Sequence, residues 1–158
     1  MSSLSVLFVC HGNICRSTMA QQYLTQMVLK APEDSSLKKF TSIDSCGTGD
    51  DDLGNQPDPG TQTVLKNHGM PPLSHVARMF VPETDSQFDY ILCMDNYVMR
   101  SVKKYLRNTK TSANIELLGK YDPKGVEEVF NPWMYPVSEF EKVYQHISRS
   151  IDEFVKSV

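Results

Sequence analysis

The sequence lacks any long apolar run, and it is poor in the features that mark membrane proteins, nucleic-acid-binding proteins and disulfide-rich proteins. No apolar stretch approaches the roughly 20 residues of a membrane-spanning helix, so no such helix is predicted. The short apolar segment that begins at Leu4 follows no basic region, so we expect no signal peptide. Runs of basic residues are also missing, and a formal net charge of −3 argues against general affinity for nucleic acids.

Cysteine and histidine are scarce, with 4 residues of each in a chain of 158. They show no zinc-ligand spacing, so we expect no metal and no cofactor. The cysteines also lack the spacing of a disulfide framework, which favours a reducing, cytoplasmic compartment. No internal repeat or low-complexity linker divides the chain, and its length suits a single domain over residues 1–158. The sequence gives no indication of an oligomeric state.

What the sequence does contain is a short segment, Cys10-His11-Gly12-Asn13-Ile14-Cys15-Arg16-Ser17, between a predicted strand and a predicted helix. The apolar run from Leu4 to Val9 indicates the strand. Apolar residues at helical spacing from Ala20 until Pro32 indicate the helix. A strand, a tight loop and a helix N-terminus aim backbone N–H groups into one concavity, which is an anion site.

Cys10 and Arg16, near the two ends of this segment, indicate its chemistry. Backbone N–H donors and an arginine both stabilise a thiolate, and the planar guanidinium matches two oxygens of a phosphate. A thiolate in such a cradle is suited to phosphoryl transfer through a cysteinyl-phosphate. The spacing of a cysteine and an arginine alone is a weak signal, and the flanking strand and helix make it specific.

Apolar periodicity divides the rest of the chain into alternating strands and helices. Further strands are predicted over residues 40–45, 88–94 and 115–118. Further helices are predicted from Asp58-Pro59 to Gly69, after Asp95-Asn96, and from Ser138, which forms a capping box with Glu141. For the helix that follows Asp95-Asn96, the predicted inner face consists of Tyr97, Val98, Ser101, Val102, Tyr105 and Leu106. This alternation predicts an α/β fold with a parallel sheet and helices on both faces, and ligands bind beyond the carboxyl ends of such strands.

Two connections are predicted to be irregular. Residues 46–52 contain Asp50-Asp51-Asp52 and are expected to form a solvated loop near the rim of the anion site. Residues 121–136 are rich in proline, and a loop of this length in a compact domain is usually functional or disordered.

The segment from Val6 to Ser17 resembles the opening of the low-molecular-weight protein tyrosine phosphatases. The resemblance continues at residues 74–78, 88–95, 115–119 and 140–145, which read Ser-His-Val-Ala-Arg, Phe-Asp-Tyr-Ile-Leu-Cys-Met-Asp, Ile-Glu-Leu-Leu-Gly and Phe-Glu-Lys-Val-Tyr-Gln. It implies a four-stranded parallel sheet, Cys10 as nucleophile, and phosphate binding by Arg16 and the loop residues His11, Gly12, Asn13, Ile14, Cys15 and Ser17. The expected substrates are phosphotyrosine in proteins or peptides and small aryl phosphates, with inorganic phosphate as product.

The same resemblance implies roles for residues around the loop. Asn13, Ser17, Ser45 and His75 match a polar network that holds the loop in shape, and asparagine at position 13 tolerates a positive φ. Trp133 and Met134 match the walls of the pocket, and Cys15 is expected to form a disulfide with Cys10 on oxidation. Several alternatives stay open: Cys15 as a packing residue, Trp133 as a loop anchor, and His11 as a residue that points away from the pocket. His68 and His146 are assigned to helix surfaces without function.

Asn131 departs from the family, which carries an aspartate there as the general acid. An amide donates a hydrogen bond but delivers no proton at neutral pH, and one general acid is typically worth ~10²–10⁴-fold in rate. Three explanations follow: an enzyme with slow turnover, a phosphotyrosine-binding pseudo-phosphatase, or an engineered substitution. Asp122, Glu127 and Glu128 are nearby acids that could substitute. Arsenate reduction ranks last, because it requires further resolving cysteines.

Overall fold

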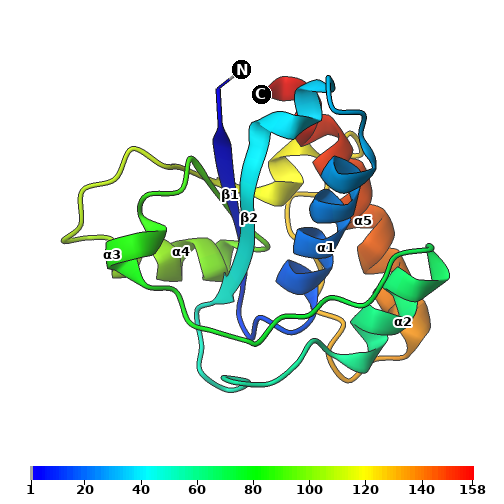
Figure 1. Ribbon diagram of the computed structural model, residues 1–158. Coiled ribbons are helices and arrows are strands. Elements are labelled where there is room, and N and C mark those ends of the chain that lie inside the picture. The colour runs from blue at the N-terminus through cyan, green and yellow to red at the C-terminus, as the bar shows by residue number, and fades with distance from the viewer. Residues whose placement is uncertain (1) are drawn as a thin grey trace.

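The centre of the fold is β1 (Leu4–Cys10), which lies in a four-stranded parallel sheet of order β2-β1-β3-β4 (Figure 1). The structure is a computed structural model that describes residues 2–158. The other strands are β2 (Phe40–Gly47), β3 (Tyr90–Cys93) and β4 (Asn114–Leu117). Every side chain from Val6 to Val9 is fully buried, because helices cover both faces of the sheet. The predicted α/β fold is confirmed.

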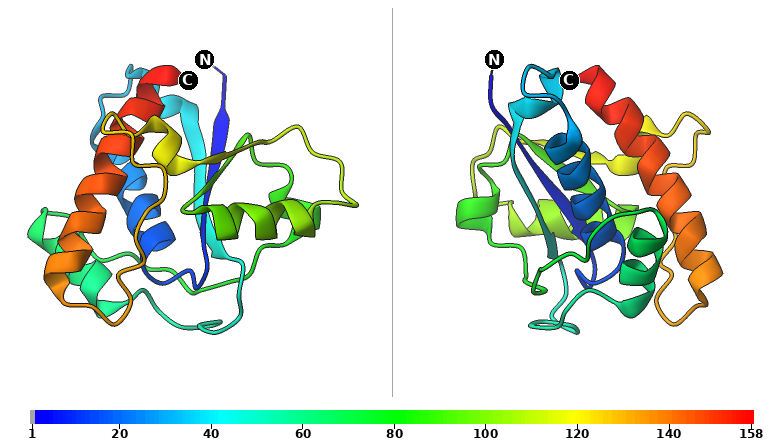
Figure 2. Two further views of the ribbon diagram at one scale, coloured as in Figure 1. Left: turned by 180° about the vertical axis from the view of Figure 1, so that it is seen from behind. Right: turned by 45° about the vertical axis from the view of Figure 1, so that its right-hand side comes forward.

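The helices form a layer on each face of the sheet, as Figure 2 shows from two further sides. They are α1 (Arg16–Lys30), α2 (Pro59–Asn67), α3 (Pro82–Asp85), α4 (Asn96–Tyr105) and α5 (Val137–Ser157), with 3-10 helices η1 (Ser36–Lys39) and η2 (Leu118–Tyr121). On one face, Phe8 belongs to a buried cluster with residues of α1, α2 and α5. On the other face, Leu7 belongs to a second cluster with residues of α4. The short α3, η1 and η2 were not predicted from the sequence.

Two predicted helix starts are confirmed by the side chains that cap them. Asp58 Oδ1 accepts a hydrogen bond from the N–H of Gly60 at 2.8 Å, and Asp95 Oδ1 accepts one from the N–H of Val98 at 2.8 Å. Each carboxylate satisfies an N–H group that the first helical turn leaves without a partner. Asp95 therefore fixes the point at which the chain leaves β3 and enters α4.

The buried face of α4 is narrower than predicted. Val98, Val102 and Leu106 are buried at successive turns, in agreement with the prediction. Tyr97 is 59% exposed and Tyr105 is 37% exposed, so their assignment to the inner face is wrong. Residues four apart stack on one face of a helix, and Tyr97 lies one residue off that line.

The start of α5 also differs from the prediction. The helix begins at Val137 after Pro136, and no side chain caps its first turn. Ser138 is therefore inside the first turn, so the predicted capping box is wrong, and Glu141 instead contacts His68 Nε2 at 2.8 Å. His146, predicted on the surface, is buried, and its Nε2 lies 2.8 Å from the carbonyl oxygen of Val126. The predicted buried stripe of α5 is confirmed at Phe140, Val143, Tyr144, Ile147, Ile151 and Phe154.

The start of β1 and the C-terminal end of α5 lie beside each other, and Cys10 lies at the opposite end of β1 (Figure 1). Leu4 and Val158 both pack against the same buried cluster. Within residues 2–158, none of the helices has the length and apolar character that crossing a membrane requires.

Candidate active site

A tight loop of residues 11–15 joins β1 to α1 at the carboxyl end of the central strand. Carbonyl groups at the end of β1 and along the loop accept hydrogen bonds from the surrounding protein. The carbonyl oxygen of Cys10 accepts a hydrogen bond from the N–H of Thr48 at 3.0 Å, and that of Ile14 accepts one from the N–H of Asp58 at 2.8 Å. Because the carbonyls are bound on the outside, the N–H groups are left on the inside of the loop.

The inward N–H groups are arranged in a way that suits an anion. Across the described residues, the N–H groups of Gly12, Ile14 and Cys15 donate to no protein atom. α1 begins directly after them, so the positive end of its dipole adds to the same concavity. The loop therefore offers several backbone donors to a bound oxyanion.

Asn13 holds the loop in this conformation. Its φ is 59°, in the left-handed region, as predicted. Its Nδ2 donates to Ser17 Oγ at 2.8 Å and to Ser45 Oγ at 2.9 Å, while its Oδ1 lies 2.8 Å from His75 Nε2. Burial lowers the pKa of His75, so the ring is neutral at pH 7. The structure thus brings together all of the residues that the resemblance assigned to this network.

Cys10 presents its thiol to the interior of the loop. Its Sγ accepts a hydrogen bond from the N–H of Asn13 at 3.2 Å and lies 3.0 Å from Ser17 Oγ. Only 3% of the residue is exposed. Both contacts hold the sulfur at the centre of the loop.

Arg16 is buried and fixed by two acceptors. Its Nη1 donates to Asp95 Oδ2 at 2.8 Å and to the carbonyl oxygen of Val129 at 2.8 Å. Those bonds use both hydrogens of Nη1 and leave the edge formed by Nε and Nη2. That edge is the planar fork that matches two oxygens of a phosphate.

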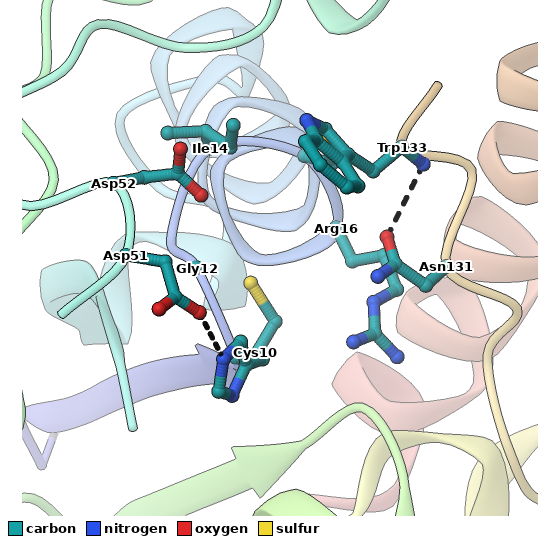
Figure 3. A pocket seen from close by; sticks show the side chains of 10 residues that line it. Cys10, Gly12, Ile14, Arg16, Asp51, Asp52, Asn131 and Trp133 are labelled. Atoms are coloured by element: carbon teal, nitrogen blue, oxygen red, sulfur yellow. Dashed lines mark hydrogen bonds and ion pairs between the residues drawn. The ribbon is translucent and has the colours of Figure 1, made fainter. Parts of the chain in front are cut away.

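The loop forms the floor of a cavity of about 470 Å³ (Figure 3). The cavity is lined by Cys10, His11, Gly12, Ile14, Cys15, Arg16, Asp51, Asp52, Asn131 and Trp133. Asp51 and Asp52 confirm the prediction that the acidic connection lies at the rim of the site. Within the described residues, no group of three or more His, Cys, Asp or Glu side chains could hold a metal ion.

His11 lines this cavity and also a second hollow that it shares with Tyr97 and Lys104 of α4. Its Nε2 lies 2.7 Å from Asp51 Oδ2 at the mouth. Its Nδ1 is buried and has no hydrogen-bond partner among the described residues. The ring packs against Gly49, where an added Cβ would lie 2.5 Å from Cε1 of His11.

The opposite wall comes from the long loop that precedes α5. Trp133 lines the cavity although it is 52% exposed, and the backbone N–H of Trp133 donates to Asn131 Oδ1 at 3.2 Å. Asn131 also lines the cavity. Its Oδ1 is turned toward the backbone of Trp133 rather than toward Cys10 (Figure 3). Met134 does not line the cavity, is 81% exposed and has a φ of 70°, so its assignment as a pocket wall is wrong. The positive φ turns the chain immediately after Trp133.

Three acidic residues were considered as substitutes for the general acid that position 131 lacks, and all three lie outside the cavity. Asp122 is buried and accepts hydrogen bonds from Arg149 Nε at 2.7 Å and Nη2 at 3.1 Å. Burial alone would raise the pKa of Asp122, but these bonds and backbone N–H donors lower it to about 2. Glu128 accepts the N–H of Asn96 at 2.9 Å, and Glu127 is exposed. None of the three lines the cavity of the described chain.

Comparison with known proteins identifies the family of this site. A model of the family described as low molecular weight phosphotyrosine protein phosphatase matches residues 5–158. The chain belongs to this family. Its relatives include the low molecular weight phosphotyrosine protein phosphatase of Pongo abelii, which is 40% identical over 98% of this chain and 96% of the relative. The Schizosaccharomyces pombe phosphatase is 36% identical over 99% of this chain and 97% of its own.

Solved structures show the same fold. YfkJ from Bacillus subtilis superposes with a TM-score of 0.85 at 32% identity, over 99% of this chain and 95% of that chain. The Drosophila arginine phosphatase superposes with a TM-score of 0.84 at 30% identity, over 96% of each chain.

The sequence alone missed two groups in this phosphatase site. Asp95 was predicted as a helix cap at the carboxyl end of a strand, but its contact with Arg16, which its second oxygen orients, was not predicted. The signal was a carboxylate at the carboxyl end of a core strand, but its use required knowing that β3 lies next to β1. The carbonyl group of Val129 carried no sequence signal, because any residue has one.

Proposed function

We propose that this protein hydrolyses phosphotyrosine in proteins or peptides and small aryl phosphates through a cysteinyl-phosphate. The observation that carries the proposal is the loop itself, in which the thiol of Cys10 and the free edge of Arg16 face one cavity with unpaired N–H groups. Membership of the phosphatase family supports the same reaction.

Each group of the loop has a role in the first step. The N–H groups of the loop and the Nε–Nη2 edge of Arg16 bind the oxygens of the phosphoryl group. The Cys10 thiolate attacks phosphorus, so an S–P bond forms while the bond to the phenolate oxygen breaks. Charge that spreads over the transferring group is stabilised by donors that are already in position.

The second step releases inorganic phosphate. A water molecule attacks the phosphorus of the cysteinyl-phosphate, the S–P bond breaks, and the thiolate of Cys10 leaves. The Ser17 hydroxyl, 3.0 Å from Sγ, is positioned to donate a hydrogen bond to the departing thiolate. Ser17 therefore favours the step that regenerates the enzyme.

Asn131 makes the proposed turnover slow. An amide at the cavity wall donates a hydrogen bond to the leaving oxygen but supplies no proton. A second candidate function follows from the same residue, namely a protein that captures phosphotyrosine and turns it over little.

Steady-state kinetics on p-nitrophenyl phosphate and on a phosphotyrosine peptide test the proposal. We expect multiple turnovers by the parent protein, and roughly 10²-fold faster turnover of the peptide by Asn131→Asp. Cys10→Ser should bind the peptide without turnover, because serine offers no thiolate. Turnover by Cys10→Ser would contradict the assignment of the nucleophile. Cys10-dependent retention of the peptide without turnover by the parent would favour the second function.

A further inference from the structure

A second hollow adjoins the catalytic cavity, between the loop that follows β1 and helix α4. It has a volume of about 170 Å³ and is called the α4 hollow below. Its lining consists of His11, Thr48, Tyr97, Ser101, Lys104 and Tyr105. His11 also lines the catalytic cavity, so the two spaces share a wall. A group bound in the α4 hollow would therefore lie next to a substrate bound over Cys10.

Two residues that line the α4 hollow carry buried polar atoms without hydrogen-bond partners. Within residues 2–158, the buried side-chain nitrogen and oxygen atoms that lack a partner are Nδ1 of His11 and Oγ1 of Thr48. Thr48 is only 6% exposed, and its carbonyl oxygen accepts a hydrogen bond from the hydroxyl of Tyr105 at 2.7 Å. Native proteins pair nearly all of their buried polar atoms with protein, water or ligand atoms. Both unpaired atoms belong to residues of one hollow, which indicates a polar occupant.

The α4 hollow also borders a helix surface that carries positive charge only. Lys104 lines the hollow and forms no ion pair within the described residues. The exposed side chains of Arg100, Lys103, Arg107 and Lys110, on α4 and just after it, form none there either. The sequence has no acidic residue between positions 96 and 110. Like charges one turn apart on a helix repel each other, and a bound anion relieves that repulsion. The charge therefore favours an anionic occupant.

Carboxylates line the catalytic cavity but not the α4 hollow. Asp51 and Asp52 belong to the lining of the cavity alone. Asp51 Oδ2 contacts Nε2 of His11 at 2.7 Å, as the dashed line from Asp51 in Figure 3 marks. The mouth of the site is thus acidic at the cavity and basic at the hollow. An acidic group of a bound peptide is attracted to one of these two sides only.

We propose that the α4 hollow binds an anionic side chain of the substrate, either a carboxylate or a second phosphoryl group. The inference rests on the proposed function. When a phosphotyrosine occupies the cavity, its neighbours in the peptide cross the mouth, and an extended chain advances about 3.3 Å per residue. A side chain a few positions from the phosphotyrosine reaches the hollow, where Lys104 supplies the opposite charge and Tyr97 a hydroxyl donor. The preferred substrates are phosphotyrosine peptides with an acidic residue on one side.

The test compares phosphotyrosine peptides that differ at a single position. Glutamate or glutamine is placed at each position in turn, from three residues before the phosphotyrosine to three residues after it, with alanine elsewhere. At one position, or at two adjacent ones, glutamate should raise kcat/KM about three- to tenfold over glutamine, mainly through a lower KM. This is roughly the scale of one charge-assisted contact at a partly exposed site. Phosphoserine at the same position should give at least the same gain, because it carries more negative charge. A gain with phosphoserine alone would identify the phosphoryl group as the occupant.

Two neighbouring lysines of α4 provide matched variants. Lys104→Gln should bring the ratio of kcat/KM for the glutamate and glutamine peptides to about one, because it removes the charge at the hollow. Lys103→Gln removes the same charge from an exposed position that does not line the hollow, and should keep the ratio within about twofold of the parent. Lys104→Glu should reverse the preference, so that a lysine peptide becomes better than the glutamate peptide. Thermal unfolding checks that each variant folds.

Binding measurements make the test independent of the rate of turnover. Cys10→Ser is expected to hold the peptides without turnover, and its dissociation constants should show the same preference for glutamate over glutamine. Equal values for every peptide pair, or an equal loss of the preference in Lys103→Gln and Lys104→Gln, would overturn the α4 hollow as an anion site. Either result leaves the proposed function intact as long as the parent hydrolyses the peptides. Turnover by Cys10→Ser would instead overturn the proposed function, so the two failures are distinguishable.

Discussion

Arg16 shows how much of the site depends on one side chain held from two directions. Its Nη1 is committed to Asp95 and to the carbonyl group of Val129, which leaves one edge for the substrate. A lysine at this position would carry the same charge but could not bind both acceptors and two phosphate oxygens in one plane.

We therefore expect Arg16→Lys to lower kcat/KM by roughly 10²- to 10³-fold, the usual scale for removal of one transition-state donor. Steady-state kinetics on p-nitrophenyl phosphate measure the change. Arg100→Lys, at an exposed position on α4, is the matched control and should keep the parent rate. A rate for Arg16→Lys equal to that of the control would show that the planar fork does not bind the phosphate.

The two cysteines of the loop lead to a second prediction. Cys10 and Cys15 both line the cavity, and burial together with the Asp58 carboxylate raises the pKa of Cys15. Cys15 therefore remains a thiol beside Cys10. Hydrogen peroxide should oxidise Cys10 to a sulfenic acid, which condenses with the thiol of Cys15 to form a disulfide and water.

Inactivation by peroxide should consequently be reversed by a thiol in the parent and become largely irreversible in Cys15→Ala. Activity recovery and intact-protein mass spectrometry follow the two outcomes. Sulfinic acid at Cys10 in the parent, without an internal disulfide, would contradict the prediction.

Residues whose role is local could be predicted, and residues whose role depends on distant neighbours could not. Asn13 was assigned a positive φ because asparagine tolerates it within the loop. His146 looked like a surface residue of α5, but it is buried against the carbonyl group of Val126. Nothing in the pattern of a helix indicates that a loop covers its outer side.

At the scale of elements, the loop that carries Asn131 and Trp133 is fastened to α5 through Asp122. That carboxylate is bound by Arg149 and by the N–H groups of Lys124 and Val126. The loop is thus anchored at its base, while its tip forms a wall of the cavity.

The anchor predicts a pH dependence of stability. The pKa of Asp122 is about 2 in the folded protein against an ordinary value of 3.8, because Arg149 and backbone donors outweigh the effect of burial. A lowered pKa means that the stabilisation is fully present above about pH 5 and is lost as the pH falls from about 4 to about 2. The difference corresponds to about 2 kcal/mol of the free energy of unfolding.

Urea unfolding of the parent and of Asp122→Asn between pH 2 and 7 measures this contribution. The variant should be less stable at pH 7 and should approach the parent as the pH falls. Glu127→Gln, at an exposed position of the same loop, should follow the parent at every pH. A constant difference between parent and Asp122→Asn across this range would show that the carboxylate does not titrate in the anchor.

Element boundaries were predictable where a single side chain sets them. Asp58 and Asp95 begin α2 and α4 as expected, because a cap acts on backbone groups within three residues. The start of α5 was misjudged, since Pro136 lets the helix begin one residue before Ser138. Ser138 is a residue type that commonly caps helices, but it lies inside the first turn and not at the N-cap position.

At the scale of the whole molecule, the order of the strands in the sheet could not be predicted from the apolar periodicity of the sequence. Alternating strands and helices predicted a parallel sheet, but they did not say that β1 lies between β2 and β3. That order is what brings Asp95 beside Arg16.

The arrangement of the chain ends predicts tolerance to circular permutation. β1 begins beside the end of α5 (Figure 1), and residues 107–113 form a largely exposed connection between α4 and β4 that lines no part of the cavity. A permutant opened within 107–113, with the ends joined by a short glycine-rich linker, should keep kcat/KM within about threefold. A permutant opened within residues 123–136 should lose most activity, because that loop supplies Asn131 and Trp133. Equal activities of the two permutants would contradict this expectation.

The contacts of Arg16 also set the order in which a nascent chain can become active. Cys10 and Arg16 are synthesised before the two acceptors of Arg16, which lie 79 and 113 positions later in the chain than Arg16. A ribosome-bound chain that ends before Val129 has the nucleophile but lacks at least one of the two acceptors that fix the guanidinium. Catalytic activity during synthesis should therefore appear only after most of the sheet and the loop before α5 have emerged, so the active site reports that folding is nearly complete.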